Sequence, residues 1–193
     1  MFAPYRWLVA RQNARASRHS IPIRPIVRAP DWGVDSRRCY QYKRFILAKI
    51  PGILHEHINT AFPTNVCLVA TVLPDGFAQV TPRGSTMVFD DEHLALWERG
   101  KGTTNENLKD GTKVTVFFRK PQLRELGILP RGGIARFYGI ATIHKSGPVY
   151  EEIWNRVIQP EKDRDPEKKG FAVLIKVERA EDLSGTSLEG LEK

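Results

Sequence analysis

The chain of 193 residues lacks the features that mark membrane spans, disulfide scaffolds and the common nucleotide sites. No apolar run approaches the roughly 20 residues that a transmembrane helix needs, so we expect no membrane partner. Two cysteines, Cys39 and Cys67, cannot form a disulfide framework and favour a reducing compartment. Cys67 falls within an apolar run, which predicts a buried and unreactive thiol.

Short cofactor and metal motifs are also missing. The sequence has no zinc-ligand spacing, no Walker sequence and no GxGxxG between a predicted strand and a predicted helix. His55 and His57 lie two positions apart in a predicted helix, so they face different directions and do not make a chelating pair. We therefore predict no metal site.

Acidic residues are absent before Asp31, and this shortage accounts for the whole net charge of +8. Residues 1–44 contain ten Lys/Arg and two Asp, whereas residues 45–193 contain twenty basic and twenty acidic residues. The second part has no basic bias, so its composition gives no reason to expect a nucleic-acid partner.

Residues 1–44 are predicted to be a basic, flexible arm. An organellar transit peptide and an arm for nucleic acid or a membrane surface are the alternatives, because an Arg-rich, acid-poor composition suits all three. The expected location is cytoplasmic, or an organelle if the arm is a transit peptide.

Short apolar runs rich in Val, Thr, Phe and Trp follow this arm, and they predict strands. Pro74-Asp75-Gly76 joins the first two runs as a tight turn. In the fifth run one face is small and apolar and is predicted to face the core, and Gly139 marks a bulge or a close backbone approach. The six predicted strands cover residues 66–73, 77–80, 94–97, 114–118, 134–144 and 171–177.

Helical periodicity appears in residues 45–62 and again from residue 146 to about residue 157. Residues 161–169 are predicted to be a solvated, charged loop, and residues 184–193 a loose tail. The pattern as a whole predicts one mainly β domain over residues 45–183, a small antiparallel barrel with flanking short helices.

Residues 99–108 (RGKGTTNENL) combine glycine, cations and hydroxyl groups just before a short helical turn. Glycines let backbone N–H groups approach a ligand, hydroxyls donate hydrogen bonds, Lys101 adds charge, and a helix N-terminus adds its dipole. This composition predicts an anion cradle, with a plain polar turn as the alternative.

The order and spacing of these segments resemble the FMN-binding split-barrel proteins of the pyridoxamine 5'-phosphate oxidase superfamily. The resemblance covers roughly residues 45–181, and the quartet Thr81-Pro82-Arg83-Gly84 is similar to a subgroup whose flavin-contacting strand carries SPRG or SPKG. Three segments carry it: residues 68–97 (LVATVLPDGFAQVTPRGSTMVFDDEHLALW), 101–108 (KGTTNENL) and 134–154 (IARFYGIATIHKSGPVYEEIW).

The resemblance implies a six-stranded antiparallel split β-barrel, a homodimer, and FMN bound at the subunit interface. By the same resemblance, Arg83, Gly84 and Ser85 would lie along the flavin ring or its phosphate. Lys101, Thr103 and Thr104 would hold the phosphate, and Asn107 would support that turn. Trp97 would lie near the same site.

Other roles are open for some of these residues. Arg83 could form a surface salt bridge, and Trp97 could pack in the core or in a dimer interface. Arg119, Lys120 and Arg131 could reach the partner's site across the interface.

The sequence departs from pyridoxamine phosphate oxidases in two places. Those enzymes carry an Arg-containing C-terminal motif that grips the substrate phosphate, and the last residues here (LSGTSLEGLEK) do not match it. The family's Arg-x-x-x-x-Lys flavin strand also has no clear counterpart. We therefore do not expect pyridoxamine phosphate to be the substrate.

The leading hypothesis is an FMN-dependent oxidoreductase acting on an unknown small organic substrate. A non-catalytic flavin- or haem-binding module and an F420-dependent reductase on the same fold are the alternatives. No catalytic acid or base stands out, and Glu98, Tyr138 and His144 are candidates by residue type alone.

Overall fold

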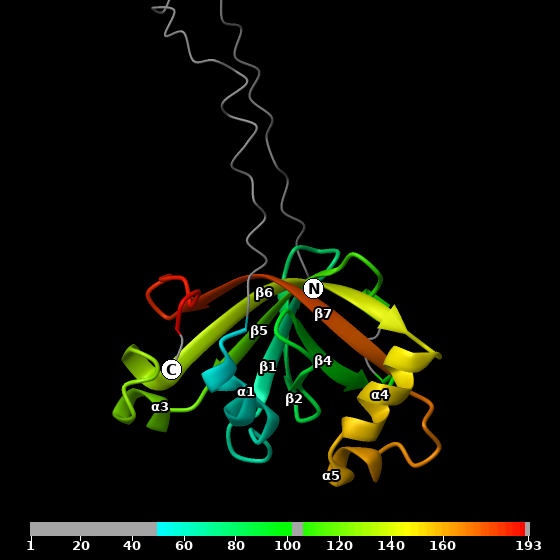
Figure 1. Cartoon of the computed structure of the whole chain (residues 1–193). Coiled ribbons are helices and arrows are strands. Elements are labelled where there is room, and N and C mark those ends of the chain that lie inside the picture. The colour runs from blue at the N-terminus through cyan, green and yellow to red at the C-terminus, as the bar shows by residue number, and fades with distance from the viewer. Residues whose placement is uncertain (1–49, 102–105, 192–193) are drawn as a thin grey trace, which may run out of the picture. The chain divides into compact units, whose positions relative to one another are not determined.

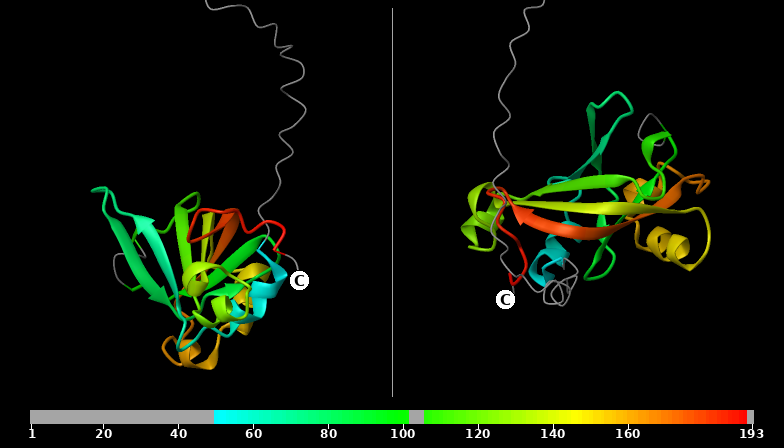
Figure 2. Two further views of the ribbon diagram at one scale, coloured as in Figure 1. Left: turned by 90° about the vertical axis from the view of Figure 1, so that its left-hand side faces the viewer. Right: turned by 90° about the horizontal axis from the view of Figure 1, so that it is seen from above.

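The computed structural model describes residues 50–101 and 106–191, and its architecture is mainly β. Seven strands form one antiparallel sheet in the order β2-β1-β5-β6-β7-β4-β3. The sheet curls into a half-barrel, and the two views of Figure 2 show the same curl from other sides (Figures 1 and 2). The strands are β1 (Cys67–Val72), β2 (Ala78–Arg83), β3 (Met87–Val88), β4 (His93–Glu98), β5 (Lys113–Arg119), β6 (Ile134–His144) and β7 (Phe171–Asp182).

The prediction of six strands is wrong by one, because it missed β3. The other six strands coincide with the six predicted apolar runs to within a few residues. β3 has only two residues, too few for an alternating pattern to appear in the sequence. Long-range contacts define it instead: Met87 and Val88 pair with Ala95 and Leu94 of β4.

Two side chains from outside the sheet hold β3 in place. The amide of Val88 donates to Asn59 Oδ1 at 2.8 Å. Arg156 donates from Nη1 to the carbonyl of Phe89 at 3.0 Å and from Nη2 to the carbonyl of Val88. Asn59 is the last residue of α1 and Arg156 the last residue of α4, so β3 lies between two helix ends.

Short helices flank the sheet, as predicted. They are α1 (Gly52–Asn59), α3 (Gln122–Glu125), the 3-10 turn η1 (Arg131–Gly133), α4 (Pro148–Arg156) and α5 (Gln159–Lys162). α4 matches its predicted range, whereas α1 is shorter than the predicted 45–62, whose first five residues lie outside the described part. None of the helices in the described part is long and apolar enough to cross a bilayer.

Glycine shapes the backbone at two predicted positions. Gly76 has φ +88° in the turn between β1 and β2, and its amide donates to the carbonyl of Leu73 at 2.9 Å. At Gly139 the register between β6 and β7 shifts, and a Cβ there would lie 2.4 Å from the carbonyl oxygen of Lys176. Both readings of Gly139, a bulge and a close backbone approach, are confirmed.

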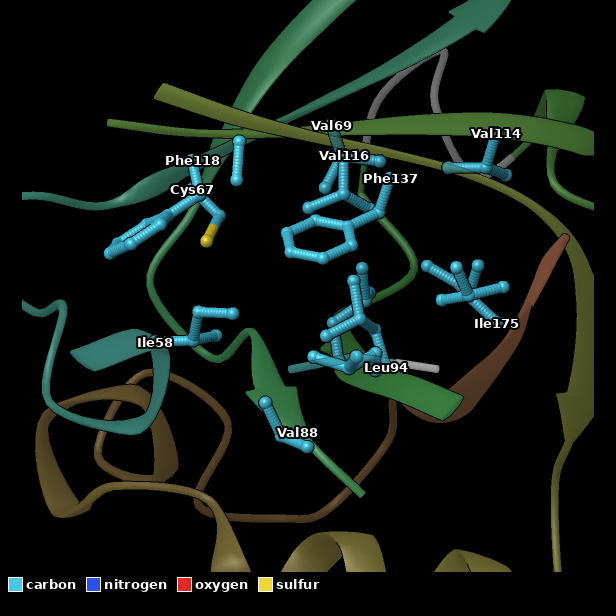
Figure 3. Close-up of a cluster of buried hydrophobic side chains, with 14 of the residues drawn as sticks. Ile58, Cys67, Val69, Val88, Leu94, Val114, Val116, Phe118, Phe137 and Ile175 are labelled. Carbon is cyan, nitrogen blue, oxygen red and sulfur yellow. The ribbon is translucent and has the colours of Figure 1, made fainter. Parts of the chain in front are cut away.

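The main core fills the inside of the curl. Figure 3 shows side chains from β1, β5, β6 and β7 meeting Leu94 of β4, Val88 of β3 and Ile58 of α1. Ala135, Phe137 and Ala141 belong to it, which confirms the predicted inner face of β6. Cys67 is buried there, and burial raises the pKa of its thiol to about 12, which fits the expected unreactive cysteine.

The structure differs from expectation at the C-terminal end, where a loose tail was expected. Residues 184–191 fold back along β7: the amide of Leu188 donates to the carbonyl of Ala180 at 3.0 Å, and the Leu188 side chain is buried. Asp182 Oδ1 accepts the amides of Ser184 and Thr186, which forms the turn. The predicted arm, residues 1–44, lies outside the described residues.

Candidate functional site

A hollow of about 250 Å³ opens where the ends of β2 and β4 meet α5. We call it the arginine hollow. Its charged lining is Arg83, Arg99, Arg164 and Glu161, and the remaining lining is Gly84, Ser85, Trp97, Phe62, Val66 and Pro82. Four of the predicted cofactor residues, Arg83, Gly84, Ser85 and Trp97, therefore share one cavity.

An ion pair between Arg83 and Glu98 joins two strands that are far apart in the sheet. Arg83 ends β2 and Glu98 ends β4, and four strands separate them in the sheet order. The curl brings the two ends together, and Arg83 Nη2 contacts Glu98 Oε2. The Glu98 side chain is only 1% exposed, so the pair is shielded from solvent. The alternative role for Arg83, a salt bridge at the surface, therefore does not describe this pair.

Ser85 ties the turn after β2 to the backbone of β4. Its hydroxyl donates to the carbonyl of Trp97 and accepts from the amide of Trp97, both at 3.1 Å. The neighbouring Thr86 hydroxyl donates to the carbonyl of Arg83 at 2.9 Å. The Ser85 hydroxyl therefore donates its hydrogen and accepts one hydrogen bond within the protein.

Trp97 lies at the wall of the hollow but packs mainly against α4. Its ring centroid is 5.1 Å from that of Tyr150 and 4.7 Å from that of Trp154. Its indole Nε1 donates to Asp165 Oδ2 at 2.9 Å. Trp97 is buried, so most of its surface packs in the core, as in the alternative role considered for it.

Asp165 collects three donors beside this tryptophan. Oδ2 accepts the Trp97 indole and the amide of Gly170, each at 2.9 Å, and Oδ1 accepts the amide of Lys169 at 3.0 Å. Burial alone would raise the pKa of Asp165. The three hydrogen bonds and the charge of Lys101 together hold that pKa below its ordinary value.

The prediction that residues 161–169 form a solvated loop is wrong at two positions. Glu161 and Asp165 are each only 7% exposed. The rest of the segment is mostly open to solvent, as the charge run suggested, so its composition concealed two buried carboxylates. Each has a specific partner set that ordinary solvated charges lack.

Gly84 and Glu161 approach closely at the floor of the hollow. A Cβ on Gly84 would lie 2.7 Å from Glu161 Oε1 and 3.0 Å from a ring carbon of Phe62. Glu161 Oε1 also accepts a hydrogen bond from Arg164 Nη1. The resemblance gave Gly84 a place beside the flavin, and in this structure a carboxylate is its neighbour.

The predicted phosphate residues are described only in part. Thr103 and Thr104 lie outside the described residues. Lys101 is exposed and follows the last residue of β4 by three positions. Asn107 does not line the arginine hollow as described, and its carbonyl accepts the Thr112 hydroxyl at 3.2 Å.

The candidate acids and bases do not converge on one place. Glu98 forms an ion pair with Arg83. The ring centroid of Tyr138 lies 4.1 Å from Cζ of Arg179, and both residues line a different groove of the sheet. His144 has a buried Nε2 with no hydrogen-bond partner among the described residues. Catalytic residues therefore stay unassigned.

Lys120 and His57 lie together on another side of the domain. Lys120 Nζ is 3.2 Å from His57 Nδ1, and burial together with this positive neighbour lowers the pKa of His57. Within the described residues, no group of three or more His, Cys, Asp or Glu side chains could hold a metal ion.

Nothing in the sequence indicated two charged residues of the hollow, Glu161 and Arg164. Arg99, the third, is the first residue of the predicted anion cradle, although it was not among the predicted cofactor-binding residues. Glu161 and Arg164 are three positions apart, a spacing that brings side chains together on a helix, but nothing local says that the carboxylate is buried.

Comparisons with known proteins agree with this fold. The family model described as pyridoxamine 5'-phosphate oxidase matches residues 54–183. Among solved structures, a variant of HupZ from Group A Streptococcus is 25% identical with a TM-score of 0.50, and the match covers 68% of this chain and 98% of that one.

Two further solved structures match this chain with TM-scores below 0.50. A Lactobacillus delbrueckii protein assigned as a pyridoxamine 5'-phosphate oxidase is 26% identical, with 69% and 93% of the two chains covered and a TM-score of 0.49. An FMN-binding protein from Syntrophomonas wolfei is 13% identical, with 68% and 86% covered and a TM-score of 0.48. No curated protein matches the chain in sequence.

Proposed function

Because this chain belongs to the pyridoxamine 5'-phosphate oxidase family, we propose that it binds FMN in the arginine hollow and acts as an FMN-dependent oxidoreductase on a small organic substrate. The observation that carries the proposal is the gathering of three guanidinium groups, from Arg83, Arg99 and Arg164, around one cavity. They come from β2, from the residue after β4 and from the segment after α5. Guanidinium groups suit a phosphate because their planar N–H donors match its oxygens.

The hollow has hydrogen-bond donors that a phosphate-bearing ligand could use. Arg99 has no ion pair among the described residues, and the buried Nε of Arg83 has no hydrogen-bond partner among them. A buried donor without a partner is costly, and a ligand oxygen would remove that cost. Lys101 does not line the hollow, but it is exposed, follows Arg99 by two residues and adds a further positive charge to this segment.

The roles of the chain's own residues follow from these contacts. Glu98 orients the Arg83 guanidinium, so this cation is held in place before a ligand arrives. Ser85 fixes the turn against β4, and Gly84 lets a ligand or a side chain approach its backbone closely. Bound FMN would supply hydride transfer at its ring, and positive groups near the ring would favour its reduced, anionic form.

An FMN titration tests the site directly. Changing both Arg99→Ala and Lys101→Ala is expected to weaken FMN binding at least about tenfold, since two cations near a phosphate dianion are lost. The measurement is the quenching of flavin fluorescence on binding. Arg124→Ala is the matched control because Arg124 is an exposed cation of α3, outside the hollow. Equal FMN affinity in all three proteins would contradict the site.

The bound cofactor separates the remaining alternatives. The absorption spectrum of the purified protein and the mass of the released cofactor distinguish FMN from F420 and from haem. If FMN is found, its reduction by NAD(P)H and its reoxidation by oxygen or an organic acceptor are expected. Bound FMN that stays oxidised with every donor would leave a non-catalytic flavin-binding protein and contradict the enzyme.

We also propose that the protein is a homodimer that uses the outer face of the β1–β2 hairpin. Val72 and Val80 are 67% and 56% exposed, and they share one face of the hairpin because Val72 pairs with Ala78 and Ala70 pairs with Val80. Phe77, which is 72% exposed, lies between the turn and β2. Residues 67–82 contain one charge, on the tip residue Asp75, so the face is apolar over most of its length. Large apolar side chains gathered on one uncharged surface are typical of an interface.

Light scattering tests the dimer. We expect twice the mass of the 22.0 kDa chain for the wild type and a single chain for the double variant Val72→Lys and Val80→Glu, which places charges on the proposed interface. Leu126→Glu is the control, since Leu126 is 63% exposed but lies after α3 and away from the hairpin. A monomeric wild type that binds FMN would contradict the proposed dimer.

A further inference from the structure

Glu161 places a negative charge inside the arginine hollow, where an anionic ligand would go. Its carboxylate is almost fully buried, accepts a hydrogen bond from Arg164, and lies against the backbone of Gly84. A carboxylate held by a guanidinium is the protein's own counterpart of a bound phosphate oxygen.

We propose that Glu161 is a built-in competitor, which the phosphate group of a ligand must displace from Arg164 to enter the hollow. The inference deepens the proposed function and rests on it, because it assumes that the ligand of this hollow is phosphorylated. It assigns Glu161 a role in selecting ligands by charge.

The charges of the hollow support this role. Three guanidinium groups face it, while Glu98 and Glu161 neutralise two of them, on Arg83 and Arg164. A phosphate dianion entering beside Glu161 would meet a like charge at close range, which is strongly unfavourable away from water. Moving the Glu161 side chain outward removes this repulsion and frees Arg164 for the ligand.

The local structure allows that movement. α5 is a single turn of four residues, and the Arg164 side chain is already 52% exposed. The Glu98–Arg83 pair differs, because both of its members end strands of the sheet and are nearly buried. Of the two carboxylates that pair with guanidinium groups of the hollow, Glu161 is therefore the one that a ligand can replace.

Selectivity for phosphorylated ligands follows from the exchange of one anion for another. FMN and inorganic phosphate carry a group that can take over Arg164, whereas riboflavin carries none. Removing the charge of Glu161 should therefore strengthen the binding of the first two ligands and leave riboflavin binding unchanged.

The test compares the full chain with Glu161→Gln and Glu167→Gln, using inorganic phosphate, FMN and riboflavin as probes in calorimetric titrations. Glutamine keeps the size of the side chain and removes its charge. Glu167→Gln makes the same charge change on the following loop, where Glu167 is exposed and pairs with Lys169. We expect Glu161→Gln to bind phosphate and FMN at least about fivefold more tightly, and Glu167→Gln to match the wild type.

A gain of affinity cannot come from structural damage, which would weaken binding. Phosphate binding that is unchanged or weaker in Glu161→Gln, a gain of equal size in Glu167→Gln, or no phosphate binding to any of the proteins would overturn the inference. FMN and phosphate that bind equally well to the wild type and Glu161→Gln would reject the competitor and leave the proposed function intact. Phosphate tightened by Glu161→Gln in a protein that does not take up FMN would keep the competitor and reject FMN as the ligand.

Discussion

Replacing Arg83 with methionine is expected to lower the free energy of unfolding by about 3–5 kcal/mol. The substitution leaves the Glu98 carboxylate in place, 1% exposed and without the guanidinium that balances it. A buried charge that loses its partner costs much more than the pair contributed, because its desolvation is no longer compensated. Urea denaturation of the two proteins measures the difference.

A double variant separates this explanation from simple loss of packing. Arg83→Met combined with Glu98→Leu removes both charges and keeps most of the volume, so it is expected to be more stable than Arg83→Met alone. Lys169→Met is the control: it breaks an ion pair whose side chains are 73% and 70% exposed, and should change stability by no more than about 0.5 kcal/mol. A double variant as unstable as the single one would mean that the Arg83 side chain acts through its shape.

Asp165→Ala is expected to cost about 2–4 kcal/mol, measured in the same way. The change leaves the Trp97 indole and the amides of Lys169 and Gly170 without their acceptor, in a place that water reaches poorly. Asp163→Ala is the matched control, since Asp163 accepts one exposed hydrogen bond from Gln159. Equal losses in the two variants would show that the cluster around Trp97 adds nothing special.

The same carboxylate makes stability depend on pH. Its pKa is lower in the folded protein than its ordinary value, so its contribution is complete above about pH 4 and is lost as the pH falls through the folded pKa. Acidification from pH 6 to pH 3 should therefore destabilise the wild type more than Asp165→Asn. Parallel losses in the two proteins would assign the acid sensitivity to other groups, such as Asp90, whose pKa is also lowered.

The strands of this fold could be predicted because their signals are local. Gly76 predicts the turn of the β1–β2 hairpin, and the alternation along β6 predicts which face of that strand is buried. Both signals lie within a few residues of sequence, and the structure agrees with both. β3 could not be found this way, since two residues have no period and their pairing depends on β4 and two helix ends.

The candidate site was predictable in part, for a different reason. The resemblance to the FMN-binding split-barrel proteins implied cofactor roles for Arg83, Gly84, Ser85 and Trp97, and these four residues line one cavity. Their individual partners come from distant positions: Trp97 bonds to a carboxylate 68 residues later in the chain. Long-range contacts of this kind decide which single residues of a charged loop are buried. The composition of the segment does not show these contacts, so it could not predict the burial of Glu161 and Asp165.

The clamp on β3 by Asn59 and Arg156 has a consequence for how the protein behaves at high concentration. β3 is an edge strand, and an edge with unpaired backbone groups is a template for another chain to add a strand. Here the Val88 amide and the carbonyls of Val88 and Phe89 are already taken by side chains. The clamp therefore blunts this edge against strand-by-strand aggregation, and it does so with two polar side chains in place of a longer strand.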